Sequence, residues 1–134
     1  MIKQDISENL VNIAFLSIGS NLGNKKRNIE KAKFLLVNNS IKILKSSNFY
    51  ETYAWPNKNH PKFYNIVIKI ITKLKPMNLF FTIKDIEKKL GRKKSLANRP
   101  RVCDIDILDY KGQTYKLYAN NNELIIPHPR LHNR

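Results

Sequence analysis

Residues 99–108 read Arg-Pro-Arg-Val-Cys-Asp-Ile-Asp-Ile-Leu, and acidic and apolar residues alternate in the second half of this stretch. An alternation with a period of two predicts a strand, here over 104–110. Asp104 and Asp106 are two residues apart, so their side chains share one face of that strand. Two carboxylates held side by side repel each other, and a divalent cation removes that cost. The alternative explanation is an edge strand with a polar outer face.

Three arginines lie just ahead of the two aspartates, at positions 92, 99 and 101. A guanidinium group binds phosphate oxygens in a bidentate manner. Mg²⁺ usually takes one or two carboxylates together with substrate phosphates. The arginines and the aspartates together therefore favour a site for Mg²⁺ and a nucleotide. A solvated basic loop would explain the arginines alone.

Hydrophobic periodicity predicts a helix on the N-terminal side of this stretch. Pro76 suits the first turn of a helix, and Gly91 suits the position just after the last turn. The apolar residues between them recur at helical spacing and are Leu79, Ile83, Ile86 and Leu90. Glu87 lies at the border of this apolar stripe. It is either a solvated side chain or one that orders Arg92 or another polar group in the site.

Earlier in the chain, a second helix is expected over 25–37, where Asn24 can cap its first turn. Strands are expected over 12–18, within 41–54 and over 63–74, with short extended segments near 114–118 and 125–127. The order β-α-β-β-α-β predicts an α+β protein of ferredoxin-like arrangement, with helices on one face of an antiparallel sheet. That fold hosts many functions and does not identify one.

The composition sets bounds on the class of protein. A chain of 134 residues with 42% hydrophobic residues forms one domain and is not disordered. We expect residues 1–11 to be an N-terminal extension and 12–134 to be the single domain. The apolar runs are too short to span a membrane, and the first residues lack the apolar region of a secretory signal. Because Cys103 is alone, no internal disulfide is expected. These features predict a cytoplasmic protein.

The formal net charge of +15 is compatible with nucleic acid, an acidic membrane or a phosphorylated ligand. Most of this charge is lysine scattered along the chain. The joint abundance of Lys, Asn and Ile is typical of an AT-rich genome. An RNA-binding module of the same strand order is the main competing interpretation, but it would need an RNP1-like run that the chain lacks. His128 stands between Pro127 and Pro129, which suggests a positioned side chain.

In order and spacing, several blocks resemble the 6-hydroxymethyl-7,8-dihydropterin pyrophosphokinase family of folate biosynthesis. The similarity covers about residues 12–134. It is carried by residues 18–23, 47–52, 63–65, 86–87, 90–92, 99–108 and 126–131, and by Arg134. The resemblance implies a ferredoxin-like fold. It also implies transfer of pyrophosphate from ATP to the pterin hydroxymethyl group, with release of AMP.

The resemblance also implies roles for individual residues. Asp104 and Asp106 would hold two Mg²⁺ ions, and Arg92 and Arg101 would contact phosphates as catalytic residues. ATP would also be bound by Glu87, His128 and Arg134. The pterin would be bound by Thr52, Phe63 and Asn65, with Phe63 stacking on its ring.

Family members usually continue beyond the position of Arg134, so we expect the usual C-terminal segment to be missing. A nucleotide-binding relative without catalysis is therefore a second alternative. The expected partners are the two small-molecule substrates, with neither nucleic acid nor membrane, and a monomer is favoured.

Overall fold

The computed structural model of this chain describes residues 10–54, 58–91, 102–119 and 121–127. Two helices and seven strands follow one another in these residues. They are β1 (Asn12–Ser20), α2 (Lys25–Asn38), β2 (Ile41–Ser46), β3 (Tyr50–Thr52), β4 (Phe63–Thr72), α3 (Pro76–Lys89), β5 (Asp104–Tyr110), β6 (Tyr115–Ala119) and β7 (Asn122–Ile126). Within the described part of the chain, neither helix is long and apolar enough to cross a membrane.

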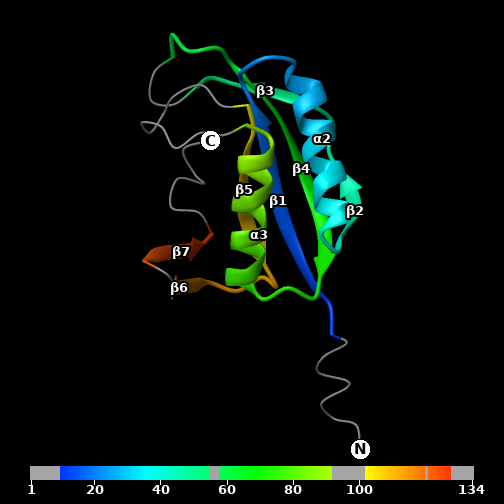
Figure 1. Cartoon of the computed structure of the whole chain (residues 1–134), viewed down its shortest axis with the longest axis vertical. Coiled ribbons are helices and arrows are strands. Elements are labelled where there is room, and N and C mark those ends of the chain that lie inside the picture. The colour runs from blue at the N-terminus through cyan, green and yellow to red at the C-terminus, as the bar shows by residue number, and fades with distance from the viewer. Residues whose placement is uncertain (1–9, 55–57, 92–101, 120, 128–134) are drawn as a thin grey trace, which may run out of the picture.

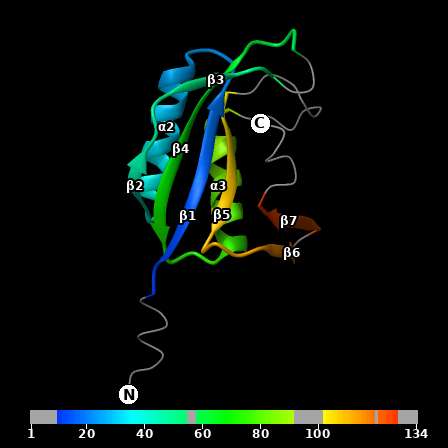
Figure 2. The ribbon, with the colours of Figure 1, turned by 180° about the vertical axis from the view of Figure 1, so that it is seen from behind.

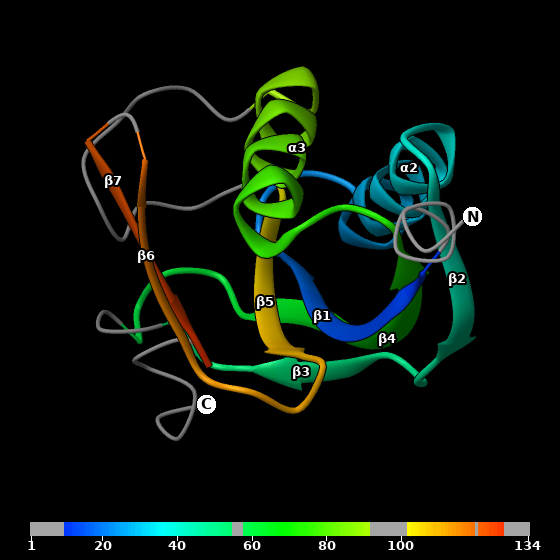
Figure 3. The same ribbon diagram turned by 90° about the horizontal axis from the view of Figure 1, so that it is seen from below.

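The main sheet has the strand order β2-β4-β1-β5, with the short β3 also pairing with β4. Every pairing in this sheet is antiparallel. Both helices lie on the same face of the sheet (Figure 3). A separate two-stranded sheet, β6 and β7, lies beside α3 and β5 (Figure 1). The predicted α+β class with an antiparallel sheet is confirmed, and the arrangement is compatible with the ferredoxin-like type.

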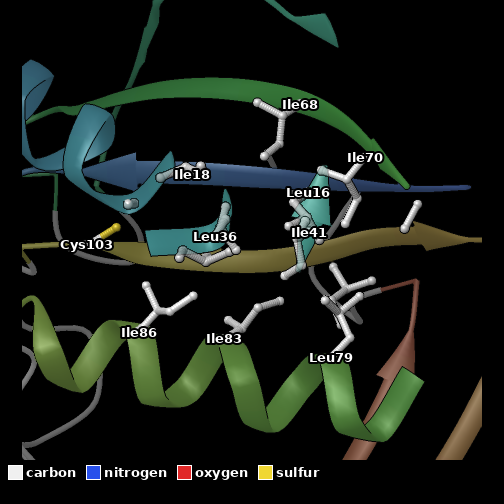
Figure 4. Close-up of a cluster of buried hydrophobic side chains, with 14 of the residues drawn as sticks. Leu16, Ile18, Leu36, Ile41, Ile68, Ile70, Leu79, Ile83, Ile86 and Cys103 are labelled. Atoms are coloured by element: carbon white, nitrogen blue, oxygen red, sulfur yellow. The ribbon is translucent and has the colours of Figure 1, made fainter. Parts of the chain in front are cut away.

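The hydrophobic core lies between the sheet and the two helices. Along β4, the alternate residues Ile66, Ile68 and Ile70 are buried toward the helices. The predicted stripe of α3 faces the sheet, with Ile83 and Ile86 directed toward β5 (Figure 4). Burying each such aliphatic side chain stabilises the fold by roughly 1.5–3 kcal/mol. Because one sheet face is filled in this way, polar groups are restricted to the other face and to the strand ends.

The residues predicted from the sequence to begin and end the helices do so in the structure. The Asn24 side chain accepts a hydrogen bond from the backbone N–H of Arg27 at 3.2 Å and caps α2. Pro76 occupies the first turn of α3. Gly91 has a φ of +99°, a left-handed conformation that glycine adopts without strain.

The strand boundaries differ from the sequence prediction in several places; for example, β4 ends at Thr72 and not at residue 74. The first strand was expected to end at Ile18, but Gly19 and Ser20 continue β1 because they pair with Asn65 and Tyr64 of β4. Pairing with a neighbouring strand overrides the turn preference of glycine and serine. The region 41–54 contains two strands, β2 and β3, and both pair with β4. The two short C-terminal segments pair with each other as β6 and β7.

Candidate active site

Cross-strand register brings the predicted pterin-binding and metal-binding residues onto one surface. Gly19 of β1 pairs with Asn65 of β4 on one side and with Asp104 of β5 on the other. Two residues earlier on β1, Ser17 lies opposite Asp106. The intervening residues of these strands are buried under the helices, so this row faces the opposite surface of the sheet. Figure 2 shows the end of β1, the start of β5 and β3 at the same end of that sheet.

Asn65 is held in one orientation by three acceptors. Its Nδ2 donates to Thr52 Oγ1 at 3.0 Å, to the Tyr50 carbonyl at 3.2 Å and to the Phe63 carbonyl at 3.4 Å. Two of these partners are carbonyls, which accept only, so they identify the nitrogen end of the amide. The Oδ1 atom is directed toward β1, because it is the atom nearest to the point where a Cβ on Gly19 would lie.

The predicted metal ligands, Asp104 and Asp106, are both partly buried on β5. Among the described residues no group of three or more His, Cys, Asp or Glu could hold a metal ion. Two carboxylates with only oxygen ligands fit Mg²⁺, which usually completes its coordination with water and substrate phosphates. They do not form the closed set of nitrogen and sulfur ligands typical of structural zinc. The residues present therefore fit a Mg²⁺-phosphate complex.

Glu87 is buried, with only 1% of its surface exposed, and is not a solvated residue at the edge of the stripe. Its Oε2 accepts a hydrogen bond from the backbone N–H of Ile105 at 2.7 Å. Its Oε1 lies 3.2 Å from Lys84 Nζ, and the Lys84 side chain is 40% exposed. A contact of Glu87 with Arg92, one partner expected from the sequence, lies outside the described residues. Among the described residues, Glu87 orders another polar group. That group is the β5 backbone between the two aspartates.

The turn after β1 is fixed against neighbouring segments by amide side chains. Asn21 is buried, and its Nδ2 donates to the Pro61 carbonyl at 3.0 Å. Asn28 of α2 donates to the Leu22 carbonyl at 2.8 Å. These bonds tie the turn to the segment that leads into β4 and to the first turns of α2. The sequence block 18–23 therefore combines a strand end with an ordered turn.

Lysine side chains lie over aromatic rings at this end of the sheet. Lys25 Nζ lies 5.2 Å from the centre of the Tyr64 ring and donates to the Lys62 carbonyl at 2.9 Å. Lys62 Nζ lies 4.8 Å from the centre of the Tyr53 ring. Such contacts hold ammonium groups near aromatic faces. They add positive charge near the sheet end that carries the candidate site.

Five predicted site residues are brought together by the sheet: Thr52, Phe63, Asn65, Asp104 and Asp106. Glu87 lies close to the two aspartates, because it accepts a hydrogen bond from the backbone N–H of Ile105 between them. The other predicted site residues, Arg92, Arg99, Arg101, His128 and Arg134, lie outside the described residues. Gly19 was given no role from the sequence, although a glycine directly after the apolar run of a strand can mark the close approach of another chain segment.

The sequence matches the protein family described as 7,8-dihydro-6-hydroxymethylpterin-pyrophosphokinase over residues 15–134. The chain belongs to this pyrophosphokinase family. The resemblance inferred from the sequence blocks is therefore confirmed. Family membership favours the enzyme interpretation over an RNA-binding module of the same strand order.

Similar proteins include two bacterial 2-amino-4-hydroxy-6-hydroxymethyldihydropteridine pyrophosphokinases. The protein from Aquifex aeolicus is 39% identical over 120 residues, which cover 90% of this chain and 72% of that protein. The protein from Bacillus subtilis is 32% identical over 124 residues, or 92% of this chain and 72% of that protein. A folic acid synthesis protein from Pneumocystis carinii is 41% identical over 127 residues, but these cover only 17% of its length. This chain thus spans under a fifth of the length of that relative.

Proposed function

We propose that this chain transfers pyrophosphate from Mg-ATP to the hydroxymethyl group of 6-hydroxymethyl-7,8-dihydropterin, in folate biosynthesis. The pterin hydroxyl oxygen attacks the β-phosphorus of ATP. The bond from that phosphorus to the oxygen bridging to the α-phosphate breaks, AMP leaves, and the hydroxyl proton passes to solvent. One observation carries this proposal. Gly19 pairs with Asn65 on one side and Asp104 on the other, so the residues assigned to the pterin and to the metal would adjoin on one sheet face.

On the pterin side, we assign recognition to Asn65, Phe63 and Thr52. The three acceptors around Asn65 Nδ2 leave Oδ1 to accept a hydrogen bond from an N–H group of the heterocycle. The Phe63 ring offers a flat apolar surface for stacking on that heterocycle. Thr52 contributes through Asn65, because its hydroxyl holds the amide in place.

On the nucleotide side, Asp104 and Asp106 would hold Mg²⁺, with two ions proposed from the family resemblance. Bound Mg²⁺ neutralises phosphate charge and helps to align the attacking and leaving oxygens. Arg92 and Arg101 are proposed to contact the phosphates as catalytic residues, and His128 and Arg134 to contact ATP. Glu87 is also assigned to the ATP site. Its bond to Ile105 supports a contribution that acts through the β5 backbone.

Several broader assignments accompany this function. The strand order β2-β4-β1-β5 with both helices on one face supports placing the domain, residues 12–134, in the ferredoxin-like class. A cytoplasmic monomer that binds only its two small-molecule substrates remains our prediction. An RNA-binding role is not favoured, because two carboxylates on the open sheet face would repel a phosphate backbone.

The test is AMP release from ATP and Mg²⁺, measured with and without 6-hydroxymethyl-7,8-dihydropterin. We expect AMP only when the pterin is present, together with pyrophosphorylated pterin in equal amount. AMP formation that does not depend on the pterin would contradict the proposal. Binding of ATP without any AMP would indicate the non-catalytic relative instead. Salt-sensitive binding of RNA without turnover would favour the RNA-binding module.

A further inference from the structure

We propose that Gly19 is a positioning residue for the pterin half of the site, and this inference rests on the proposed function. Its missing side chain lets the Asn65 amide and the Phe63 ring settle against the backbone of β1. A methyl group at this position would separate them from that strand. Gly19 thereby sets how closely the pterin approaches the strand that separates Asn65 from the aspartates of β5.

The requirement for glycine here comes from space and not from backbone conformation. Gly19 lies in regular antiparallel pairing on both sides of β1. Among the described glycines, positive φ angles occur at Gly23, Gly91 and Gly112, and Gly19 is not among them. Any residue could adopt its backbone conformation. Glycine inside a strand destabilises it by roughly 0.5–1 kcal/mol relative to alanine, so its presence here needs another reason.

The space that a side chain would need is already filled by the predicted pterin-binding residues. A Cβ on Gly19 would lie 2.8 Å from Asn65 Oδ1 and 3.2 Å from Phe63 Cδ1. The third neighbour, the Tyr64 carbonyl oxygen, would lie at 3.6 Å, an ordinary contact. The two tight contacts are therefore made by the two side chains assigned to the heterocycle, and all three neighbours belong to β4.

Asn65 cannot move away from an added methyl group without losing hydrogen bonds. Its Nδ2 is held by Thr52, Tyr50 and Phe63, so a shift of Oδ1 would stretch at least one of these bonds. A shift would also misplace the acceptor offered to the pterin. No atom of β5 is among the three nearest neighbours of the added methyl carbon. The effect of a side chain at Gly19 should therefore fall on the pterin and spare ATP.

The experiment compares Gly19→Ala with the wild-type chain. Pterin affinity is measured by titration of pterin fluorescence in the presence of Mg²⁺ and a non-hydrolysable ATP analogue, and KM is measured for each substrate. We expect pterin affinity to fall by about tenfold or more, since misplacements of about 1 Å in a site have large effects. The KM for ATP should change by less than about twofold, far below the tenfold change that corresponds to about 1.4 kcal/mol. Unchanged pterin affinity, or equal losses for both substrates, would overturn the inference.

Gly112→Ala is the matched control. It adds the same methyl group where nothing lies within 4 Å, but at a φ of +67°. It should lower the melting temperature through backbone strain and leave pterin affinity unchanged. A loss of pterin affinity in this control would show that general destabilisation explains the effect, and the inference would fail.

A double variant keeps the proposal testable if Gly19→Ala is poorly folded. In Gly19→Ala/Asn65→Ala the closest obstacle to the methyl group is gone. The Gly19→Ala substitution should then lower the melting temperature less than it does in the wild-type background. If Gly19→Ala lowers the melting temperature equally in both backgrounds, the positioning role is overturned. If the wild-type chain neither binds the pterin nor forms AMP, the proposed function fails, and this thermal comparison still decides whether Gly19 positions Asn65.

Discussion

The Glu87 carboxylate accepts a hydrogen bond from the backbone N–H of Ile105 at 2.7 Å, at the residue between Asp104 and Asp106. Among the described residues, β5 stands at the end of the strand order β2-β4-β1-β5 and pairs with a strand of this sheet, β1, on one side only. A backbone N–H on the other edge must find a different partner when it is buried. Glu87 of α3 supplies that partner. The helix thereby fixes the strand backbone from which both predicted metal ligands project.

Glu87→Ala should destabilise the fold, because the Ile105 N–H loses its acceptor. We expect the free energy of unfolding to fall by about 1–3 kcal/mol, the usual effect of leaving a buried polar group unsatisfied. Glu87→Gln retains an acceptor oxygen and should lose less. Urea unfolding of both variants measures this difference. In AMP-release assays, Glu87→Ala should also need more Mg²⁺ for half-maximal rate.

Glu30→Ala is a matched control for this prediction. Glu30 pairs with Lys33 at 3.7 Å with the same i,i+3 helical spacing as Lys84 and Glu87, but its side chain is 59% exposed. Exposed ion pairs contribute little to stability, so this variant should unfold within about 0.5 kcal/mol of wild type. Equal stability of Glu87→Ala and Glu30→Ala would show that the hydrogen bond to Ile105 makes no net contribution to the free energy of unfolding.

Replacing Asp104 and Asp106 together by Ala should abolish Mg²⁺-dependent AMP release and leave the fold intact. The carboxylates lie on the sheet face away from the core, so their removal exposes no apolar surface. Far-UV circular dichroism checks the fold, and a Mg²⁺ titration of AMP release checks the function. Turnover that persists in this double variant would rule out the metal assignment.

Asp109→Ala provides the control on the same strand. Its carboxylate accepts a hydrogen bond from the backbone N–H of Gly112 at 3.0 Å and holds the turn after β5. We expect this variant to lose about 1 kcal/mol of stability with the turn bond and to keep its Mg²⁺ dependence.

Thr52→Val should weaken pterin binding without affecting ATP. Valine has nearly the same shape as threonine but does not accept the 3.0 Å hydrogen bond from Asn65 Nδ2. The amide then keeps only its two backbone carbonyl partners and is less firmly oriented. Loss of one neutral hydrogen bond corresponds to about 0.5–1.5 kcal/mol, or a few-fold to about tenfold in affinity. Pterin titrations and the KM for ATP separate the two half-sites. A parallel loss for ATP would contradict the assigned role of Thr52.

The sequence predicted the elements of the sheet well because their periodicity reflects burial. The alternation over 104–110 corresponds to β5, and the apolar spacing after Pro76 corresponds to α3. The end of β1 was misplaced because glycine and serine have a local preference for turns. That preference is overridden by pairing with β4, a contact between residues far apart in the chain. The local composition of the sequence does not reveal such a long-range pairing.

Residue type and spacing indicated Asp104, Asp106 and the nearby arginines as candidates, and the roles of the other candidate residues came mainly from the resemblance. How these residues are placed relative to one another depends on strand register. No spacing in the sequence places Gly19 between Asn65 and Asp104. The bond between Glu87 and Ile105 likewise joins residues 18 positions apart, from a helix to a strand. The sequence showed Glu87 only as a residue at the border of an apolar stripe. Which polar group it meets depends on how α3 packs against the edge of the sheet.

Tyr110 should make the stability of the fold depend on alkaline pH. Burial of this residue, which is only 2% exposed, raises the pKa of its hydroxyl; the hydrogen bond from Asn12 partly opposes this rise, and Tyr115 adds to it. The hydroxyl also donates to the Leu74 carbonyl. The folded state therefore holds the phenolic proton more tightly than the unfolded state, where the pKa is about 10. The resulting stabilisation is fully present below about pH 10, the unfolded-state pKa, and is lost as pH rises through the higher folded-state pKa.

The measurement compares urea unfolding of wild type and Tyr110→Phe between pH 7 and pH 11. At pH 7 the variant should be less stable by about 1–2 kcal/mol, because the Asn12 amide and the Leu74 carbonyl lose their partner. This difference should shrink above pH 10, since only the wild type has a proton to lose at this position. Lysines also titrate in this range, but they are common to both chains and cancel in the comparison. Tyr118→Phe, at a side chain that is 67% exposed, should follow the wild-type curve. A difference between wild type and Tyr110→Phe that stays constant up to pH 11 would contradict the linkage.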